Sequence, residues 1–547
     1  MVFFSLISNF AAIMRKSIAR YGQWGLSVLV GIVMFLFWYV WYPHALSYQE
    51  QYQLFLWTGD YFLEKISLPG GFADWVGEFI VQFYYVEWLG ALLLALLFVA
   101  LQRLTLRLMY SLTSYLLPLT SILSLLPVAV MWWLMGDINV MLSLPVAVVL
   151  ALALACIRLR KSLSWLDFLI LPVAYWMIGP VVWLYVIIRV IQIGWKHLWS
   201  AGWLVAVQLM VYAWLLPQWP LQQTMTGLSY YRIPLQYPQW SGYDKDMYEL
   251  IRLDYLVRNE RWDEIVKRAG EYQVKTPFWS NCVNLALSQK RLLADRMFDF
   301  YQSGEDALVM PRTRDLTSML PSAEVFWRLG MVNSAQRYMF DTQESILNAK
   351  KSGRCTKRIA ECMIVNGQYL TARKQIDLLK KSLFYRSWAE EMEKMIEAET
   401  EAKAEAVQTT PRSALPLCSA KNPSRSSSAR LLPKGRKNSG GERAVYGRLR
   451  EMRYKEDFLY SYDEIDKMFG LLFMNNQDNK MALDYFLGQM LLKGNVQGFQ
   501  QYLGLAQQYG GYRQMPLGYQ DAMRCIQMQG NVQGSPYANY VKRMMER

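Results

Sequence analysis

Histidine and cysteine are scarce in this chain of 547 residues, and their scarcity restricts the chemistry open to it. The two histidines, His44 and His197, have no histidine or cysteine partner at the spacing of a zinc site. The six cysteines are too few and too scattered for a disulfide framework. We therefore expect no metal site and no cofactor.

Common catalytic motifs are missing as well: the sequence contains no P-loop, no Gly-x-Ser-x-Gly and no His-Glu-x-x-His. The formal net charge is +14. Residues 412–455 hold much of this excess, with about twelve Lys and Arg against two glutamates, Glu442 and Glu451. Because the charge is concentrated in one segment, it indicates a basic linker and not a binding face. We predict no nucleic-acid partner.

Long apolar runs are abundant in the first part of the chain. Hydrophobic residues make up 53% of the sequence, with continuous apolar runs before Pro217 and amphipathic helical patterns after it. A helix needs about 20 apolar residues to cross a bilayer core of ~30 Å. The pattern predicts an all-α protein: a polytopic transmembrane helical bundle of about seven crossings, followed by a degenerate tetratricopeptide-like helical repeat domain.

The predicted membrane part consists of an interfacial N-terminal segment at residues 1–21 and a transmembrane domain at 22–216. Residues 165–194 are ambiguous, because thirty apolar residues suit one long helix or two short ones. Gly179-Pro180 interrupts this run, as a helical hairpin requires, so the hairpin is the preferred interpretation. Lys and Arg recur in every second loop, which places the N-terminus in the cytoplasm. A hairpin then puts the C-terminal domain outside, and a single helix puts it inside.

The first loop, residues 43–87, is richer in polar groups than a simple connector needs to be. It contains acidic, amide and aromatic side chains and a Pro-Gly-Gly turn. We expect it to be structured and to face outward. The candidate site residues of this loop are His44, Gln51, Pro69, Gly70, Gly71 and Gln82.

After a connector at residues 217–243, amphipathic helices are expected at 244–400 and again at 456–547. A helix–turn–helix pattern recurs near Asn259, Gly330, Gly367 and Gly494. This pattern resembles the turn of tetratricopeptide repeats; an irregular helical bundle is the alternative. Between 401 and 455 the proline, serine and basic residues predict a disordered linker, because they cannot bury a core.

The chain resembles an uncharacterised family of bacterial (Bacteroidota-type) polytopic membrane proteins. The resemblance is carried by residues 48–61 (YQEQYQLFLWTGDY), 69–71 (PGG), 82–85 (QFYY), 175–180 (YWMIGP) and 460–469 (YSYDEIDKMF). It covers most of the chain except residues 402–450. It implies a multi-pass protein of the bacterial cytoplasmic (inner) membrane, so that an external C-terminal domain is periplasmic. It brings no known activity and no catalytic residues.

Stacked helical repeats form extended surfaces that bind peptides or proteins. The leading hypothesis is therefore a membrane-anchored scaffold or assembly factor without catalytic activity. Its partners would be the lipid bilayer and a protein bound to the repeat domain.

The first alternative is a membrane-embedded glycosyltransferase-like enzyme acting on lipid-linked sugars in cell-envelope polysaccharide synthesis. In that case Glu50 is the candidate base, Asp60 a second carboxylate, and Arg232 a phosphate contact. No Asp-Asp or Asp-Glu pair follows the first crossing, however, and both carboxylates also suit solvated or capping positions. The second alternative, a transporter component, rests on the broken helix around Gly179-Pro180.

Overall fold

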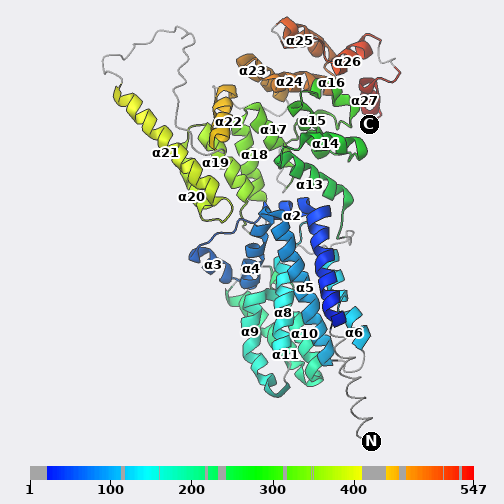
Figure 1. Cartoon of the computed structure of the whole chain (residues 1–547), viewed down its shortest axis with the longest axis vertical. Helices are drawn as coiled ribbons and strands as arrows, with labels where there is room; N and C mark the ends of the chain where they lie inside the picture. The colour runs from blue at the N-terminus through cyan, green and yellow to red at the C-terminus, as the bar shows by residue number, and fades with distance from the viewer. Residues whose placement is uncertain are drawn as a thin grey trace. The chain divides into compact units, whose positions relative to one another are not determined.

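The protein is described by a computed structural model in which all regular structure is helical. The described residues are 21–112, 117–158, 161–215, 220–228, 230–231, 242–311, 317–346, 348, 350–409, 439–454, 464–508, 511–528 and 533–546. They contain no strand, which confirms the predicted all-α class. The chain divides into two compact units: residues 1–255 with 347–351, and residues 256–346 with 352–547 (Figure 1).

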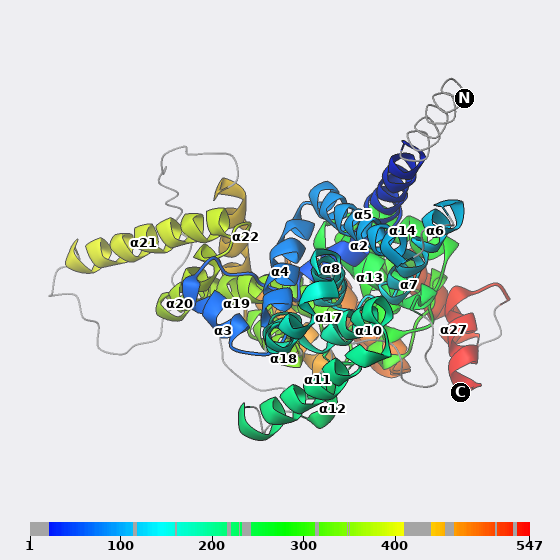
Figure 2. The ribbon, with the colours of Figure 1, turned by 90° about the horizontal axis from the view of Figure 1, so that it is seen from below.

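The first unit begins with an apolar helix at Tyr21–Trp41, whose last turn is the π-helix η1 (Phe37–Trp41). The segment after it is folded into short helices: α2 (Pro43–Glu50), α3 (Gly59–Ile66), α4 (Gly71–Val81) and the 3-10 turn η2 (Gln82–Tyr85). The remaining helices are α5 (Glu87–Leu112), α6 (Leu117–Leu123), α7 (Leu126–Leu134), α8 (Ser143–Ile157), α9 (Asp167–Ile178), α10 (Val182–Ile193), α11 (Trp199–Met210), α12 (Leu221–Met225) and α13 (Lys245–Arg258). Helix α8 is central in this unit, because α4, α5 and α10 all pack on it (Figure 2).

The predicted count of seven crossings is wrong. Among the described residues, three stretches are long and apolar enough to span a membrane: Tyr21–Trp41, Glu87–Ser111 and Ser164–Ile193. The other predicted crossings contain shorter helices. The chain at 112–135 is divided between α6 and α7, and α8 has 15 residues, or about 22 Å of helix against a core of ~30 Å. The apolar segments of the sequence are thus longer than the individual helices that form within them.

Residues 164–193 fold back on themselves. Asp167 and Arg189 are 22 positions apart, which corresponds to about 33 Å along one helix. Nevertheless Arg189 Nε lies 2.9 Å from Asp167 Oδ2. Helices α9 and α10 are therefore antiparallel, and the chain reverses at the 3-10 turn η4 (Gly179–Val181), where Gly179 has a φ of +68°. The predicted hairpin is confirmed, but each arm is a helix of 12 residues, about 18 Å long and too short for a full crossing.

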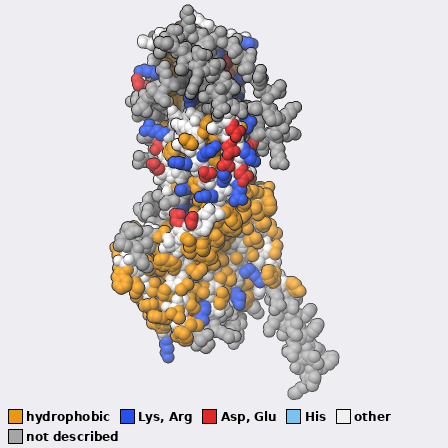
Figure 3. All heavy atoms as spheres, turned by 90° about the vertical axis from the view of Figure 1, so that its left-hand side faces the viewer, with side chains coloured by type: hydrophobic (Ala, Val, Ile, Leu, Met, Phe, Trp, Pro, Cys, Tyr) orange, Lys and Arg blue, Asp and Glu red, His pale blue; other side chains and the backbone are white. Residues whose placement is uncertain are grey.

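Hydrophobic side chains dominate the face of the first unit that Figure 3 shows. Large exposed ones come from several helices: Trp24, Leu96, Val173, Ile191 and Trp214. Soluble monomers seldom expose contiguous apolar patches of this kind. Together with the three long apolar stretches, this surface is consistent with a membrane location.

The second unit is built of short helices that pack on their neighbours in the chain. Its helices are α14 (Trp262–Glu271), α15 (Pro277–Gln289), α16 (Leu293–Arg296), α17 (Met319–Leu329), α18 (Val332–Ser345), α19 (Gly353–Val365), α20 (Tyr369–Lys380), α21 (Arg386–Thr409), α22 (Ser439–Met452), α23 (Ile465–Asn475), α24 (Lys480–Leu492), α25 (Val496–Gln508), α26 (Leu517–Gln527) and α27 (Pro536–Met545). Each of α17 to α20 packs on the helix that follows it, as do α23 and α24. The turns at Gly330, Gly367 and Gly494 have φ values of +83°, +74° and +68°, a conformation that favours glycine.

The linker predicted at residues 401–455 is shorter than expected, because helices extend into it from both ends. Helix α21 continues to Thr409, in a stretch rich in Ala and Glu, which have high helix propensity. Helix α22 begins at Ser439, and its Arg450 forms an ion pair of 3.1 Å with Glu399 of α21. Residues 410–438 lie outside the described part, as do residues 1–20 of the predicted interfacial segment.

Candidate functional site

Four charged side chains form a buried cluster in the first unit. Lys65 Nζ lies 3.2 Å from Asp74 Oδ2 and 2.8 Å from Glu78 Oε1. Lys350 Nζ lies 2.7 Å from Asp74 Oδ1 and 2.7 Å from Glu78 Oε1. The side chains of Asp74, Glu78 and Lys350 are at most 4% exposed, and that of Lys65 is 14% exposed. We call these four residues the ion cluster.

The positions of these groups follow from local structure and from one distant segment. Asp74 and Glu78 are four residues apart on α4 and so share a face of that helix. Lys65 stands in the last turn of α3. Lys350 comes from the short segment 347–351, which belongs to the first unit although its neighbours in sequence belong to the second. The Leu54 N–H donates to the Lys351 carbonyl at 2.8 Å, which fixes the backbone of this segment beside α2.

The cluster shifts the pKa values of its members in opposite directions. Burial raises the pKa of Asp74, but Lys350 and Lys65 outweigh that effect and hold it at about 2. Burial raises the pKa of Glu78 by more than Lys350 lowers it. Burial lowers the pKa of Lys65. For Lys350, burial is outweighed by Asp74 and Glu78, so its pKa is raised. Asp74 and Lys350 are thus the strongly held ion pair.

This pair predicts a dependence of stability on acid. The pKa of Asp74 falls from 3.8 to about 2 on folding, which is worth about 2 kcal/mol. Because the folded-state value is the lower one, this stability is present above pH ~4 and is lost as the pH falls toward 2. We expect Asp74→Asn to lack this loss. Chemical unfolding of both proteins from pH 5 to pH 2.5 measures it, and parallel curves for the two would contradict the assignment.

Two glycine turns that are distant in sequence meet beside the ion cluster. The Gly70 N–H donates to the Trp176 carbonyl at 2.8 Å. A Cβ on Gly70, whose φ is +82°, would lie 3.3 Å from Gly179 Cα. The Tyr231 hydroxyl donates to the Ile178 carbonyl at 3.2 Å and closes the same junction. The Pro-Gly-Gly turn before α4 therefore packs on the turn of the α9–α10 hairpin.

The other predicted site residues of the loop lie in packed positions. His44 is buried in the first turn of α2, with its ring centroid 5.6 Å from that of Tyr42. Gln51 is buried at the C-terminal end of α2. The Gln82 side chain accepts a hydrogen bond of 3.1 Å from Trp57 Nε1 and donates one of 2.9 Å to the Phe79 carbonyl. These contacts hold the loop together.

The residues of the enzyme hypothesis lie in different surroundings. Glu50 is buried at the end of α2, whereas Asp60 is exposed in the first turn of α3, where an acidic group suits the helix dipole. Arg232 lies outside the described residues. A cavity beside α2, lined by Tyr48, Gln49 and Lys350 among others, measures about 20 Å³. This is room for about one water molecule, so this cavity is too small for a sugar.

A second buried charge cluster joins the open ends of the α9–α10 hairpin. Asp167 accepts hydrogen bonds from Tyr185 Oη at 2.7 Å and from Arg189 Nε at 2.9 Å. His197 Nε2 lies 2.9 Å and Arg158 Nη2 3.4 Å from its carboxylate. The carboxylate is therefore surrounded by donors that hold the two arms together. Buried charges of this kind also mark pathways in transporters, the second alternative considered from the sequence.

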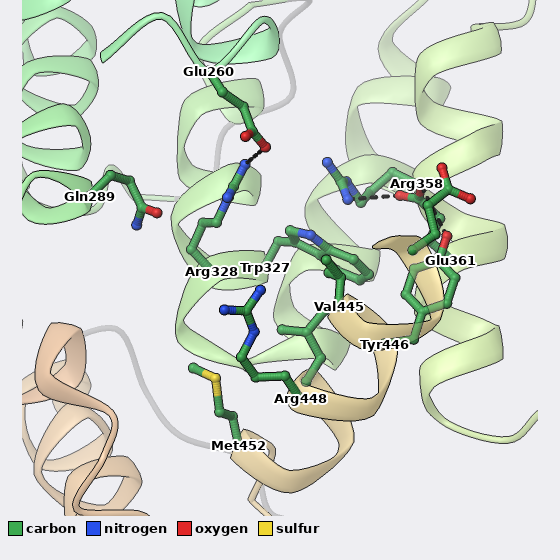
Figure 4. Close-up of a pocket in the computed structure, with 12 residues that line it drawn as sticks. Glu260, Gln289, Trp327, Arg328, Arg358, Glu361, Val445, Tyr446, Arg448 and Met452 are labelled. Carbon is green, nitrogen blue, oxygen red and sulfur yellow. Dashed lines mark hydrogen bonds and ion pairs between the residues drawn. The ribbon is translucent and has the colours of Figure 1, made fainter. Parts of the chain in front are cut away.

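A cavity with polar walls lies in the second unit (Figure 4). It has a volume of about 320 Å³, at the small end of the range for ligand pockets. Its lining includes Gln289, Trp327, Arg328, Arg358, Tyr446 and Arg448. Helix α22 forms one wall, and α17 and α19 form the other. We call this cavity the α22 cleft.

Aromatic and charged groups alternate along the walls of this cleft. The Arg358 guanidinium carbon lies 4.4 Å from the centroid of the Trp327 ring, and the Tyr446 ring packs edge-on against Trp327 at 6.3 Å. Arg358 is held by Glu324 at 2.9 Å and by Glu361 at 2.7 Å. These contacts fix the tryptophan in the floor of the cleft.

Sequence reasoning did not single out the ion cluster or the α22 cleft. The spacing of Asp74 and Glu78 places both carboxylates on one helical face, which was a usable signal. No local signal connects them to Lys350, which is 276 positions from Asp74. The cleft was hidden because α22 lies within the range predicted as a linker. Among the described residues, no group of His, Cys, Asp and Glu is arranged to hold a metal ion.

Comparison with known proteins identifies a family and nothing more specific. A family model described as a family of unknown function (DUF6057) matches residues 18–426 and 424–547. Neither the curated proteins nor the solved structures gave a match. The family match supports the resemblance deduced from the sequence, but it carries no information on the organism, the compartment or a tetratricopeptide relationship.

Proposed function

Because the chain belongs to the DUF6057 family, whose function is unknown, we propose its role from its own geometry: a membrane-anchored scaffold that binds a protein partner in the α22 cleft. The single observation behind the proposal is that cleft, with its cavity of about 320 Å³ and its mixed aromatic and charged walls. Aromatic side chains and arginine are enriched at the centres of protein–protein interfaces. Trp327, Tyr446 and Arg358 supply that combination in fixed positions.

The helix arrangement of the second unit supports this reading. Consecutive helices pack on one another and are joined by turns with glycine in the left-handed conformation. In tetratricopeptide and related repeats the same order of helix pairs creates a surface for peptides. We propose that this unit is a degenerate repeat array of that kind.

The first unit supplies the anchor in this proposal. Tyr21–Trp41 and Glu87–Ser111 are long and apolar enough to span a bilayer, and further apolar side chains are exposed on the shorter helices. We propose a location in the bacterial cytoplasmic membrane. In this proposal the α9–α10 hairpin enters and leaves the bilayer on the same face, and the second unit lies on the periplasmic side. The lipid-linked-sugar enzyme remains a hypothesis without a described cavity of suitable size.

Photochemical cross-linking in cells tests the proposal. A photoreactive amino acid in place of Gln289, at the edge of the cleft (Figure 4), is expected to capture one reproducible protein when illuminated. The matched control replaces Leu370, which is 83% exposed on α20 and is not part of the cleft. An adduct at Gln289 and none at Leu370 supports the scaffold. No adduct at Gln289, or the same adducts at both positions, rejects it.

A further inference from the structure

The charged side chains that line the α22 cleft do not all have a partner of opposite charge. Of the three carboxylates that line it, Glu260 is paired with Arg328 and Glu361 with Arg358, whereas Glu442 lies 4.0 Å from Lys357 and its Oε2 is buried without a hydrogen-bond donor among the described residues. Of the three arginines, Arg328 and Arg358 are held by these partners. Arg448 is exposed and makes no ion pair with any residue that the structure describes. One positive charge on the wall of the cleft therefore has no counter-charge among the residues that the structure describes.

A second observation points in the same direction. Arg328 Nε is buried and has no hydrogen-bond acceptor among the described residues. The Arg328 side chain comes from α17 and the Arg448 side chain from α22, and both lie on the same side of Trp327 (Figure 4). A buried donor without an acceptor is unfavourable by about 1–3 kcal/mol. Arg328 Nε is not accessible from the cleft and the Arg328 guanidinium is paired with Glu260, so an acceptor in the cleft would be bound by the exposed Arg448.

Apolar surface adjoins these two groups. Trp327, Val445, Leu449 and Met452 line the same cavity. A free small anion would use the arginines but would leave this apolar wall in water. A peptide that carries a carboxylate beside an aromatic or aliphatic side chain would use both surfaces. Arginine binds carboxylates with directed, charge-assisted hydrogen bonds.

We propose that the partner of the α22 cleft is an acidic protein segment, with a carboxylate bound by Arg448 and an adjacent apolar side chain packed on Trp327. This inference rests on the proposed scaffold function and specifies its ligand. Charge favours this occupant, because a basic segment would meet the exposed guanidinium of Arg448, which forms no ion pair with a described residue.

The test uses the full-length protein in lipid nanodiscs and three fluorescein-labelled peptides of equal length. Each peptide has a central Leu-Trp pair, flanked by Glu, by Gln or by Lys. Fluorescence polarisation measures the dissociation constants. We expect the Glu peptide to bind at least about tenfold more tightly than the Gln peptide, which is the factor one charge-assisted hydrogen bond supplies. Arg448→Glu should abolish that preference, and Arg448→Lys should keep part of it.

Arg443→Glu is the matched control. Arg443 is also exposed on α22, but it is not part of the cleft lining, so the substitution changes the net charge equally. It should alter the binding of the Glu peptide less than about twofold. Equal binding of the Glu and Gln peptides, no binding of any peptide, or an equal loss in both variants would overturn the inference. Inorganic phosphate that binds the cleft as tightly as the Glu peptide would also overturn it.

The two proposals can fail separately. If cross-linking from Gln289 captures a partner while Arg448→Glu leaves peptide preference unchanged, the scaffold stands and the acidic ligand is wrong. If no adduct forms at Gln289, the scaffold itself is wrong.

Discussion

Lys350→Met is expected to lower the free energy of unfolding of the first unit by about 3–5 kcal/mol, the usual result of removing one member of a buried ion cluster. The substitution removes the ammonium group that lies 2.7 Å from both Asp74 and Glu78. Lys65 alone would then face two buried carboxylates. Thermal unfolding of the purified protein, followed by circular dichroism in detergent, measures the change.

The adjacent lysine provides the control for this prediction. Lys351 is exposed, and its contribution to the fold is its backbone carbonyl, which accepts from Leu54 N–H. Lys351→Met should therefore unfold like the unsubstituted protein. A second variant, Lys350→Met combined with Glu78→Gln, should recover part of the lost stability because it removes one uncompensated charge. If Lys350→Met and Lys351→Met unfold at the same temperature, the ion cluster does not stabilise the fold.

Gly71→Ala is expected to prevent α4 from packing as observed, with a loss of about 3 kcal/mol or more. A Cβ at this position would lie 1.8 Å from the Lys65 carbonyl oxygen and 3.1 Å from Ile66 Cα, and both of these are backbone atoms. No side-chain movement relieves such a contact. The consequence should be visible as rapid proteolysis within residues 59–85 and as a lower melting temperature.

Gly59→Ala tests whether the effect is specific to the position. Gly59 begins α3 in the same segment, and a Cβ there would meet nothing within 4 Å. Alanine is also the better helix former by roughly 1 kcal/mol, so this variant should be as stable as the unsubstituted protein or slightly more stable. Similar protease sensitivity in the two variants would mean that the clash at Gly71 is relieved by a shift of the backbone.

Sequence analysis correctly predicted features that are determined by residues close together in the chain. The turns at Gly330, Gly367 and Gly494 were expected because a glycine followed by a new apolar pattern ends one helix and begins the next. The break at Gly179-Pro180 was expected because a proline interrupts a helix. The structure places a turn at each of these positions.

The features that sequence analysis did not predict depend on contacts between residues that are far apart in the chain. Apolar composition indicated which segments are apolar but not the lengths of their helices, so the segments of α6, α7 and α8 were counted as full crossings. The Pro-Gly-Gly turn and the hairpin turn were both recognised as landmarks, yet nothing in either indicates that Gly70 lies against Gly179. Likewise Lys350 is one lysine among many until the fold brings it to Asp74.

The segment 347–351 makes the protein difficult to dissect genetically. Since this segment is part of the first unit, the chain passes from one unit to the other after Tyr255, again after Ile346 and a third time after Lys351. A truncated chain that stops at residue 255 retains Asp74 and Glu78 but lacks their strongest cation. A single protease cut after Ile346 or Lys351 leaves the two units covalently joined, and a cut after Tyr255 leaves segment 347–351 attached to the second unit. Studies of the isolated membrane part therefore need the peptide 347–351 to be supplied, or fused back, before its behaviour represents that of the whole protein.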